Sequence, residues 1–211
     1  MRILGIDPAR NTGLALWDTG MDGPPATRAA QIRDDLDRCR TLGILREFCG
    51  AEAPDYIIME RPFLGEPMIR NGKILKKQNI KGYDTHISVL HHWMHCLYDY
   101  CGAVLRSPES KGHYTQSHAR LVWPSTWQAV IFEGIMVSGD SKVKSRHAAA
   151  RKWSDIRSDL SSDEYDACNL CLFQWLLCRD LGTDPKHKSI TDALRAGGWI
   201  LPTATERSLL K

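Results

Sequence analysis

The chain has 211 residues, of which 43% are hydrophobic and 25% charged, and its formal net charge is +3. This is an ordinary globular composition, long enough to bury a sizeable core. No apolar run approaches the ~18 residues of a membrane-spanning helix, and we expect no secretory signal, because the sequence opens directly with a predicted strand. The seven cysteines are an odd number, and several lie in apolar helical patterns. We therefore expect reduced thiols in a cytoplasmic protein, not a disulfide framework.

The opening stretch predicts two strands joined by a tight turn. Residues 3–6 form an apolar strand that ends at Asp7, and residues 14–17 form the next strand. A carboxylate at the end of a buried strand is costly to desolvate, so it needs a hydrogen-bond partner or a cation. Asp7 is therefore either the cap of an Asx-type turn or the central ligand of a catalytic metal site.

The elements that follow the opening hairpin predict a change from antiparallel to parallel pairing. Residues 26–33 form a third strand after a short loop, which favours an antiparallel meander. Apolar residues at helical spacing then predict a helix over residues 36–49, with Gly50 as its stop. A strand after this helix would be joined to the sheet by a parallel crossover.

That next strand carries a second carboxylate. Residues 56–60 are nearly all apolar, which is typical of a strand buried on both faces, and they end in Glu60. If this strand neighbours the first one, Asp7 and Glu60 emerge at the same end of the sheet. The alternative for Glu60 is a salt bridge to the adjacent Arg61.

A basic stretch, residues 61–82, follows Glu60. It contains six Lys and Arg residues, one acid and one aromatic, Phe63. Such a mixture suits phosphate contacts and base stacking, whereas the alternative is a solvated loop whose Phe63 packs on its own scaffold. The expected DNA contacts in this stretch are Phe63, Arg70, Lys73, Lys76, Lys77 and Lys81.

The middle of the chain predicts two helices and a strand. Apolar spacing predicts a helix over residues 83–100, and we expect a polar or packing role for its His91 and His95, because the Glu of an HExxH zinc motif is absent. The remaining elements are a strand at 102–106, a loop or short hairpin at 107–120, and a short helix at 126–132 with Ser125 as N-cap.

The C-terminal third combines a basic segment with a pair of acids. Residues 141–152 read as a basic loop running into a helix, and its cations are either DNA contacts, among them Lys144 and Arg146, or a solvated helix face. A strong helix over residues 160–178 carries Asp163 and Asp166 on one face of its first turn. Acids at that position also complement the helix dipole.

Together, the two strand-terminal acids and the pair on the late helix suggest a metal site. Four clustered carboxylates without a cation would raise some pKa values steeply. Oxygen ligands suit Mg²⁺ or Mn²⁺. Two such ions about 3.5–4 Å apart stabilise the attacking and leaving oxygens of phosphodiester cleavage.

These motifs resemble those of the RuvC-type Holliday junction resolvases, in the RNase H-like nuclease superfamily. The likeness spans roughly residues 1–180, and the divergence resembles that of phage-encoded relatives. The matching positions are residues 3–7 with Thr12 and Gly13, Met59 with Glu60, the aromatic Phe63, the basic Lys142, and Asp163, Asp166 and Ala167.

The resemblance implies a fold, an assembly and a mechanism. The fold would be α/β, a mixed five-stranded sheet flanked by helices with the first three strands antiparallel. Residues 1–180 would form the nuclease domain, and residues 181–211 a C-terminal extension of unknown role. A homodimer would resolve branched DNA, especially four-way junctions, by paired nicks with 5′-phosphate products, in a bacterial or phage-infected cytoplasm.

The resemblance also implies roles for the acids and for one lysine. Asp7 would bridge two Mg²⁺ or Mn²⁺ ions, Glu60 and Asp166 would each complete one, and Asp163 would lie nearby. Lys142 would stabilise the negative charge that develops at the scissile phosphate.

The sequence departs from the family pattern in ways that keep alternatives open. The family's second lysine has no counterpart in the helix around residues 125–133, and the loops at 64–78 and 107–120 look longer than usual. A broader nuclease acting on forks or flaps is therefore one alternative. An actin-like ATPase or kinase relative and a catalytically inactive DNA-binding scaffold are the others.

Overall fold

A computed structural model of the chain describes residues 1–32, 36–61, 69–70, 73–74, 80–102 and 118–180. Its five-stranded sheet has the order β3-β2-β1-β4-β7. The strands are β1 (Arg2–Asp7), β2 (Asn11–Asp18), β3 (Ala26–Gln31), β4 (Tyr56–Glu60) and β7 (His118–Val122). A separate antiparallel pair is formed by β5 (Ile69–Arg70) and β6 (Lys73–Ile74).

The sheet is mixed, as the sequence predicted. Strands β1, β2 and β3 pair antiparallel, whereas β1, β4 and β7 pair parallel. In the parallel register Ile6 of β1 lies beside Met59 of β4. The next residues, Asp7 and Glu60, therefore leave neighbouring strands at the same edge of the sheet.

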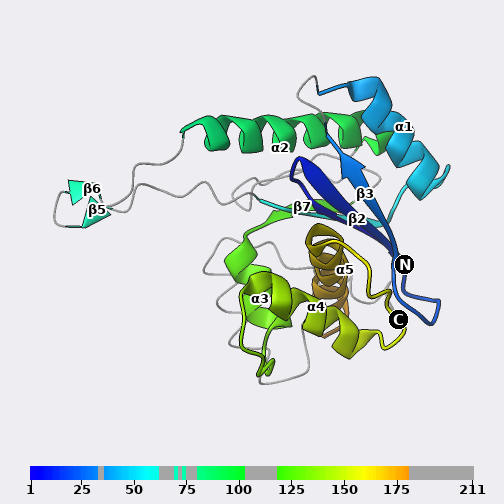
Figure 1. Cartoon of the computed structure of the whole chain (residues 1–211). Helices are drawn as coiled ribbons and strands as arrows, with labels where there is room; N and C mark the ends of the chain where they lie inside the picture. Colours follow the sequence, from blue (N-terminus) through cyan, green and yellow to red (C-terminus); the bar gives the residue numbers. More distant parts are fainter. Residues whose placement is uncertain (33–35, 62–68, 71–72, 75–79, 103–117, 181–211) are drawn as a thin grey trace.

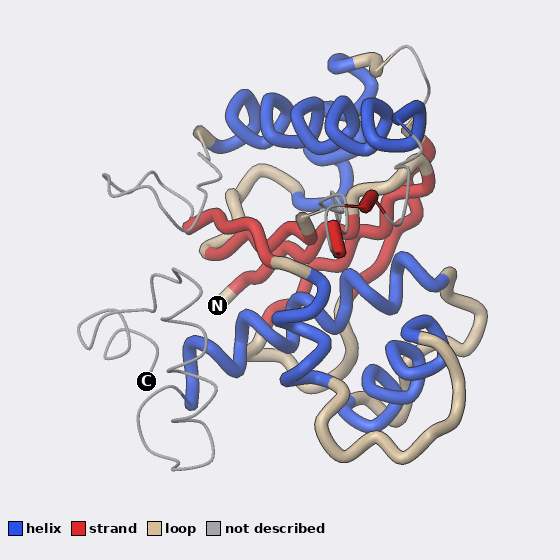
Figure 2. Tube along the Cα trace, turned by 90° about the vertical axis from the view of Figure 1, so that its left-hand side faces the viewer, coloured by secondary structure: helices blue, strands red, loops and turns tan. Residues whose placement is uncertain are grey.

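Helices cover both faces of the sheet, as Figures 1 and 2 show. They are α1 (Arg38–Cys49) and α2 (Ile80–Cys101) on one face, and α3 (Pro124–Ile131), α4 (Ser141–Lys152) and α5 (Ser162–Asp180) on the other. None of these helices, in the part of the chain that is described, is long and apolar enough to cross a membrane.

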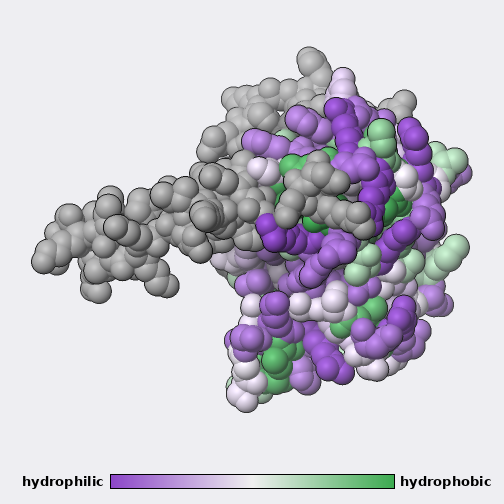
Figure 3. Space-filling model, turned by 45° about the horizontal axis from the view of Figure 1, so that its top comes forward, coloured by the Kyte–Doolittle hydropathy of each residue, from purple (hydrophilic) through white to green (hydrophobic). Residues whose placement is uncertain are grey.

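Alternation along the strands divides the core into two clusters. Successive strand residues point to opposite faces, so Leu4 and Ile6 pack under α1 and α2 with the buried Trp93. Ile3 packs on the other face with residues of α3, α4 and α5. On the described part of the surface in Figure 3, hydrophobic atoms appear as small patches among hydrophilic ones.

The fifth strand begins where the sequence predicted a loop or short hairpin. The predicted strand at 102–106 falls almost wholly outside the described residues, and the sheet is completed instead by β7, whose first three residues lay in the predicted loop. The prediction of a loop or short hairpin was wrong there, because β7 is an edge strand that pairs parallel with β4. Among its hydrophobic residues only Leu121 and Val122 are buried, and the polar His118 and Arg120 interrupt the apolar pattern.

Three helix starts also differ from the prediction. Trp123, not Ser125, is the N-cap of α3, because Pro124 takes the first helical position, where its missing N–H costs nothing. The predicted loop at the start of 141–152 is helical, since the Asp140 side chain accepts hydrogen bonds from the backbone of Lys142 and Val143. Helix α2 begins at Ile80, within the basic stretch.

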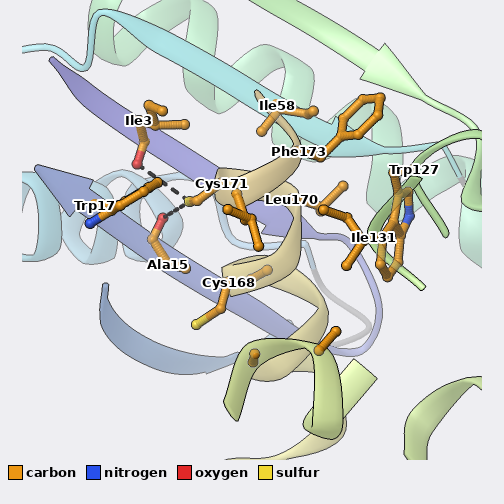
Figure 4. Close-up of a cluster of buried hydrophobic side chains, with 14 of the residues drawn as sticks. Ile3, Ala15, Trp17, Ile58, Trp127, Ile131, Cys168, Leu170, Cys171 and Phe173 are labelled. Atoms are coloured by element: carbon orange, nitrogen blue, oxygen red, sulfur yellow. Dashed lines mark hydrogen bonds between the residues drawn. The ribbon is translucent and has the colours of Figure 1, made fainter. Parts of the chain in front are cut away.

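Helix α5 lies directly on β1 and β2 because two glycines lack side chains there. A Cβ added at Gly13 would stand 2.0 Å from the backbone oxygen of Asp163, and one at Gly5 would stand 2.2 Å from that of Ala167. Figure 4 shows Cys171 pointing from α5 toward β1 and β2, where its Sγ lies 3.5 Å from the Ile3 oxygen and 3.4 Å from the Ala15 oxygen.

The Gly13 contact predicts a large loss of stability on adding one methyl group. Gly13→Ala should lower the free energy of unfolding by at least ~2 kcal/mol, because the obstructing atoms are backbone and cannot rotate away. Chemical denaturation followed by circular dichroism measures this loss.

Gly43 in α1 supplies the matched control. A Cβ there would meet nothing within 4 Å, so Gly43→Ala should stabilise the protein by roughly 0.5–1 kcal/mol through helix propensity. Equal effects of the two substitutions would contradict the packing argument.

Candidate active site

Four partly buried carboxylates come from three elements that meet at one edge of the sheet. Asp7 ends β1, Glu60 ends β4, and Asp163 and Asp166 lie near the start of α5. Burial, followed by the charges of Glu60, Asp166 and Asp163, raises the pKa of Asp7 well above its usual value, while Lys142 lowers it. The acids predicted from separate parts of the sequence therefore share one electrostatic environment.

The pKa values of Glu60 and Asp166 are raised for the same reasons. Burial is the main cause for Glu60, whose pKa rises to about 7 with added repulsion from Asp166 and Asp163. Burial also raises the pKa of Asp166 to about 6, with repulsion from Asp163 and an opposing attraction from Lys142. Both groups therefore titrate near neutral pH in the metal-free protein.

Trp127 holds the Glu60 carboxylate by a hydrogen bond that the sequence analysis did not foresee. Its indole is fully buried in α3 and packs edge-on against Phe132, with ring centroids 5.4 Å apart. A buried indole N–H needs an acceptor, and Trp127 Nε1 donates to Glu60 Oε2 at 2.6 Å. This bond lowers the pKa of Glu60 against the effect of burial.

A chain of hydrogen bonds connects α4 to Asp166 on α5. The Asn169 side chain on α5 donates to the Ser145 backbone oxygen at 2.9 Å and to its hydroxyl at 2.7 Å. The Ser145 hydroxyl in turn bonds the Asp166 carboxylate and lowers its pKa. Lys142 lies one turn before Ser145, so this chain of bonds fixes the face of α4 that carries the lysine. The sequence signal for it is Asn169, a polar residue within the apolar run of α5.

Thr12 fixes the turn that follows Asp7. It is fully buried, donates from Oγ1 to the Ala9 oxygen at 2.7 Å, and accepts from Trp93 Nε1 at 3.0 Å. The turn is thereby tied both to itself and to α2 on the far side of the sheet, which limits how far Asp7 can move.

The other predicted site residues are the expected DNA contacts. Lys144 and Arg146 lie on α4 beside Lys142, while Arg70, Lys73 and Lys81 belong to β5, β6 and α2. The remaining predictions in the basic stretch, Phe63, Lys76 and Lys77, lie outside the described residues.

The structure also bears on two questions from the sequence analysis, the partner of Arg61 and the place of two histidines. Arg61 forms no ion pair with Glu60 in the described part of the chain, and its guanidinium lies over the Trp123 ring instead, 4.2 Å from the centroid. His91 and His95 are exposed on α2.

The oxygen donors of the four acids fit a hard divalent ion, although their side chains do not form a ready coordination site. Within the described residues, no group of three or more His, Cys, Asp or Glu side chains is placed so that it could hold a metal ion. The four acids offer only oxygen donors, which Mg²⁺ and Mn²⁺ prefer. Their mutual repulsion is what a cation would relieve.

Comparison with solved structures identifies the fold. RuvC of T. thermophilus in complex with a Holliday junction substrate matches with a TM-score of 0.53 at 12% identity, over 87% of this chain and 98% of that chain. The chain therefore has a RuvC-like, RNase H-like fold, which confirms the predicted fold class. An origin in phage stays a prediction. No protein-family model matches the sequence, and no curated protein matches it.

Two further structures are similar to a lesser degree. A second T. thermophilus RuvC structure has a TM-score of 0.48 at 13% identity, over 82% of this chain and 92% of that chain. The yeast mitochondrial Holliday junction resolvase Ydc2 has a TM-score of 0.43 at 16% identity, over 93% of this chain and 82% of that chain.

The raised pKa values predict that the metal-free protein loses stability as pH rises. The folded pKa values of Glu60 and Asp166, about 7 and about 6, lie above the ordinary 4.5 and 3.8. Their contribution to stability is thus complete below about pH 4 and is lost as pH rises through 6 and 7. Denaturation in EDTA at pH 5 and pH 7.5 measures the loss.

Removing one charge should reduce that loss. Asp166→Asn is expected to be more stable than the parent at pH 7.5 in EDTA, by on the order of 1 kcal/mol after partial exposure is discounted. Asp155→Asn, at an exposed position, is the control and should change little. A larger gain at pH 5 than at pH 7.5 would contradict the assigned direction.

Proposed function

We propose that the chain is a metal-dependent, structure-specific endodeoxyribonuclease that resolves four-way DNA junctions by paired nicks. The observation that carries the proposal is the convergence of β1, β4 and α5, whose four acids repel one another beside Lys142. A RuvC-like fold supports it, and T. thermophilus RuvC is seen in complex with a Holliday junction substrate.

In this proposal Asp7, Glu60, Asp163 and Asp166 hold two Mg²⁺ or Mn²⁺ ions. When bound, such ions activate water for in-line attack and stabilise the leaving oxygen. The chain's own part is to orient the ligands: Trp127 holds one oxygen of Glu60, and the Ser145 hydroxyl holds Asp166. Lys142, which is exposed and attracts the Asp7 and Asp166 charges, offers its ammonium to the phosphate.

The substrate would be branched DNA, bound by cations of α4 and of the basic stretch. On α4 these are Lys142, Lys144 and Arg146, and in the basic stretch they are Arg70, Lys73, Lys76, Lys77 and Lys81, with Phe63 as the stacking aromatic. A four-way junction has two-fold symmetry, so paired nicks call for a homodimer. Residues 181–211 would extend the nuclease domain of residues 1–180.

A less selective nuclease for forks and flaps is the second candidate. The observation that favours it concerns α3, whose Trp127 contacts Glu60. This helix contains neither Lys nor Arg, so the family's second lysine is absent from it. Fewer cations near the phosphate leave junction selectivity to other contacts.

Cleavage of a substrate panel distinguishes the two functions. With Mg²⁺ present, a mobile four-way junction should be cut at least tenfold faster than a replication fork or a plain duplex, with paired cuts that leave 5′-phosphates. Denaturing gels of end-labelled strands measure the rates and map the ends. Equal rates on all three substrates would leave a nuclease without junction specificity.

Asp7→Asn is the matched control for the chemistry. It keeps the shape of the side chain but removes the central charge, so cleavage should fall by ~10³-fold or more while junction binding persists. Full activity in this variant would show that Asp7, and with it the proposed cluster, takes no part in the reaction.

Ser145→Ala tests the hydrogen bonds around Asp166. The loss of the hydroxyl should raise the Mg²⁺ concentration needed for half-maximal cleavage roughly 10–100-fold, because outer hydrogen bonds orient metal ligands. Ser158→Ala, at an exposed position, should leave the Mg²⁺ dependence unchanged. An unaltered Mg²⁺ dependence in Ser145→Ala would show that Asp166 does not need this donor.

A further inference from the structure

Glu60 and Arg61 are neighbours of opposite charge, yet two tryptophans hold them apart. Trp127 Nε1 donates to Glu60 Oε2 at 2.6 Å, and the Arg61 guanidinium lies 4.2 Å from the centroid of the Trp123 ring. The Arg61 backbone N–H also donates to the Val122 oxygen at 2.7 Å. The residue that follows β4 is thus anchored to the end of β7 by its backbone and by its side chain.

Within the part of the chain that is described, nothing compensates the Arg61 charge. Among the described residues no carboxylate pairs with it, and its charge is not among the main causes of the shift in the pKa of Glu60. Both Arg61 and Trp123 are partly exposed. A guanidinium over an indole ring gains from the cation–π attraction, and its N–H donors remain in the plane of the guanidinium. Such a group is pre-organised for two parallel bonds to one phosphate.

We propose that Arg61, held over the Trp123 ring, binds a backbone phosphate of the DNA strand that passes the carboxylate cluster. The proposal rests on the proposed nuclease function. Arg61 directly follows Glu60 in the chain, so the phosphate it binds lies within a few nucleotides of the one at the acids. The contact is to the backbone and carries no base preference.

Salt-dependent binding tests the contact without relying on cleavage. In the Asp7→Asn background and EDTA, Arg61→Gln should weaken junction binding about fivefold to tenfold at low salt. It should also make the slope of log K against log salt shallower by about 0.9, the value of one lost phosphate contact. Fluorescence anisotropy over a salt series gives both quantities.

Arg46→Gln is the matched control, since it removes the same charge from an exposed position on α1, across the sheet from α3. It should leave the salt slope unchanged. An Arg61→Gln slope and affinity equal to those of Arg46→Gln would overturn the proposal.

The role of Trp123 is tested by coupling. Trp123→Leu should weaken binding about threefold when Arg61 is present and have no further effect in the Arg61→Gln background, because the ring acts through the guanidinium. Arg61→Lys should keep the salt slope but lose affinity, as an ammonium lacks the planar fork. Equal effects of Trp123→Leu in both backgrounds would overturn the stacking role.

Failure of the proposed function would look different. Equal binding of junction and duplex, with Arg61→Gln still reducing the salt slope on both, would overturn junction specificity and support the phosphate contact. No DNA binding by the unmodified protein would overturn both proposals.

Discussion

The close contact between α5 and the first two strands is the constraint on which the candidate site depends. Gly13 lies opposite Asp7 in the β1–β2 register, and its missing side chain lets the Asp163 backbone come against the sheet. Gly5 does the same one turn further along α5, at Ala167. A side chain at either glycine would push the helix away and move its two acids from Asp7, so backbone packing sets the geometry of the charges.

Concentrating four acids at this contact opposes folding in the metal-free protein, and the surroundings offset only part of the cost. The first turn of α5 favours acids through its dipole. Trp127 and Ser145 each supply a hydrogen bond that favours the ionised carboxylate. Burial nevertheless prevails, since the pKa values of Glu60 and Asp166 remain raised. Under the proposed function, a bound cation would relieve this repulsion.

The parts of the fold that could be predicted from sequence are those with an unbroken local pattern. Strands β1 and β4 are continuous apolar runs, each followed by an acid, so both the strands and the acids stood out. Strand β7 is an edge strand with mixed polarity and carries no such pattern. Trp127 and Ser145 were missed as parts of the site because their roles come from contacts with distant residues, Glu60 and Asp166, that local spacing does not encode.

The pair Glu60 and Arg61 shows why neighbours in sequence need not be partners in space. Successive residues of an extended chain point to opposite sides, so a strand that turns Glu60 toward α3 directs the next side chain elsewhere. The salt bridge that the sequence left open would have required the strand to break that alternation. The alternation instead places the Glu60 carboxylate near the acids of β1 and α5. It places the Arg61 guanidinium over the Trp123 ring. Under the two proposals, Glu60 would hold a metal cation and the adjacent Arg61 would bind a phosphate of the DNA.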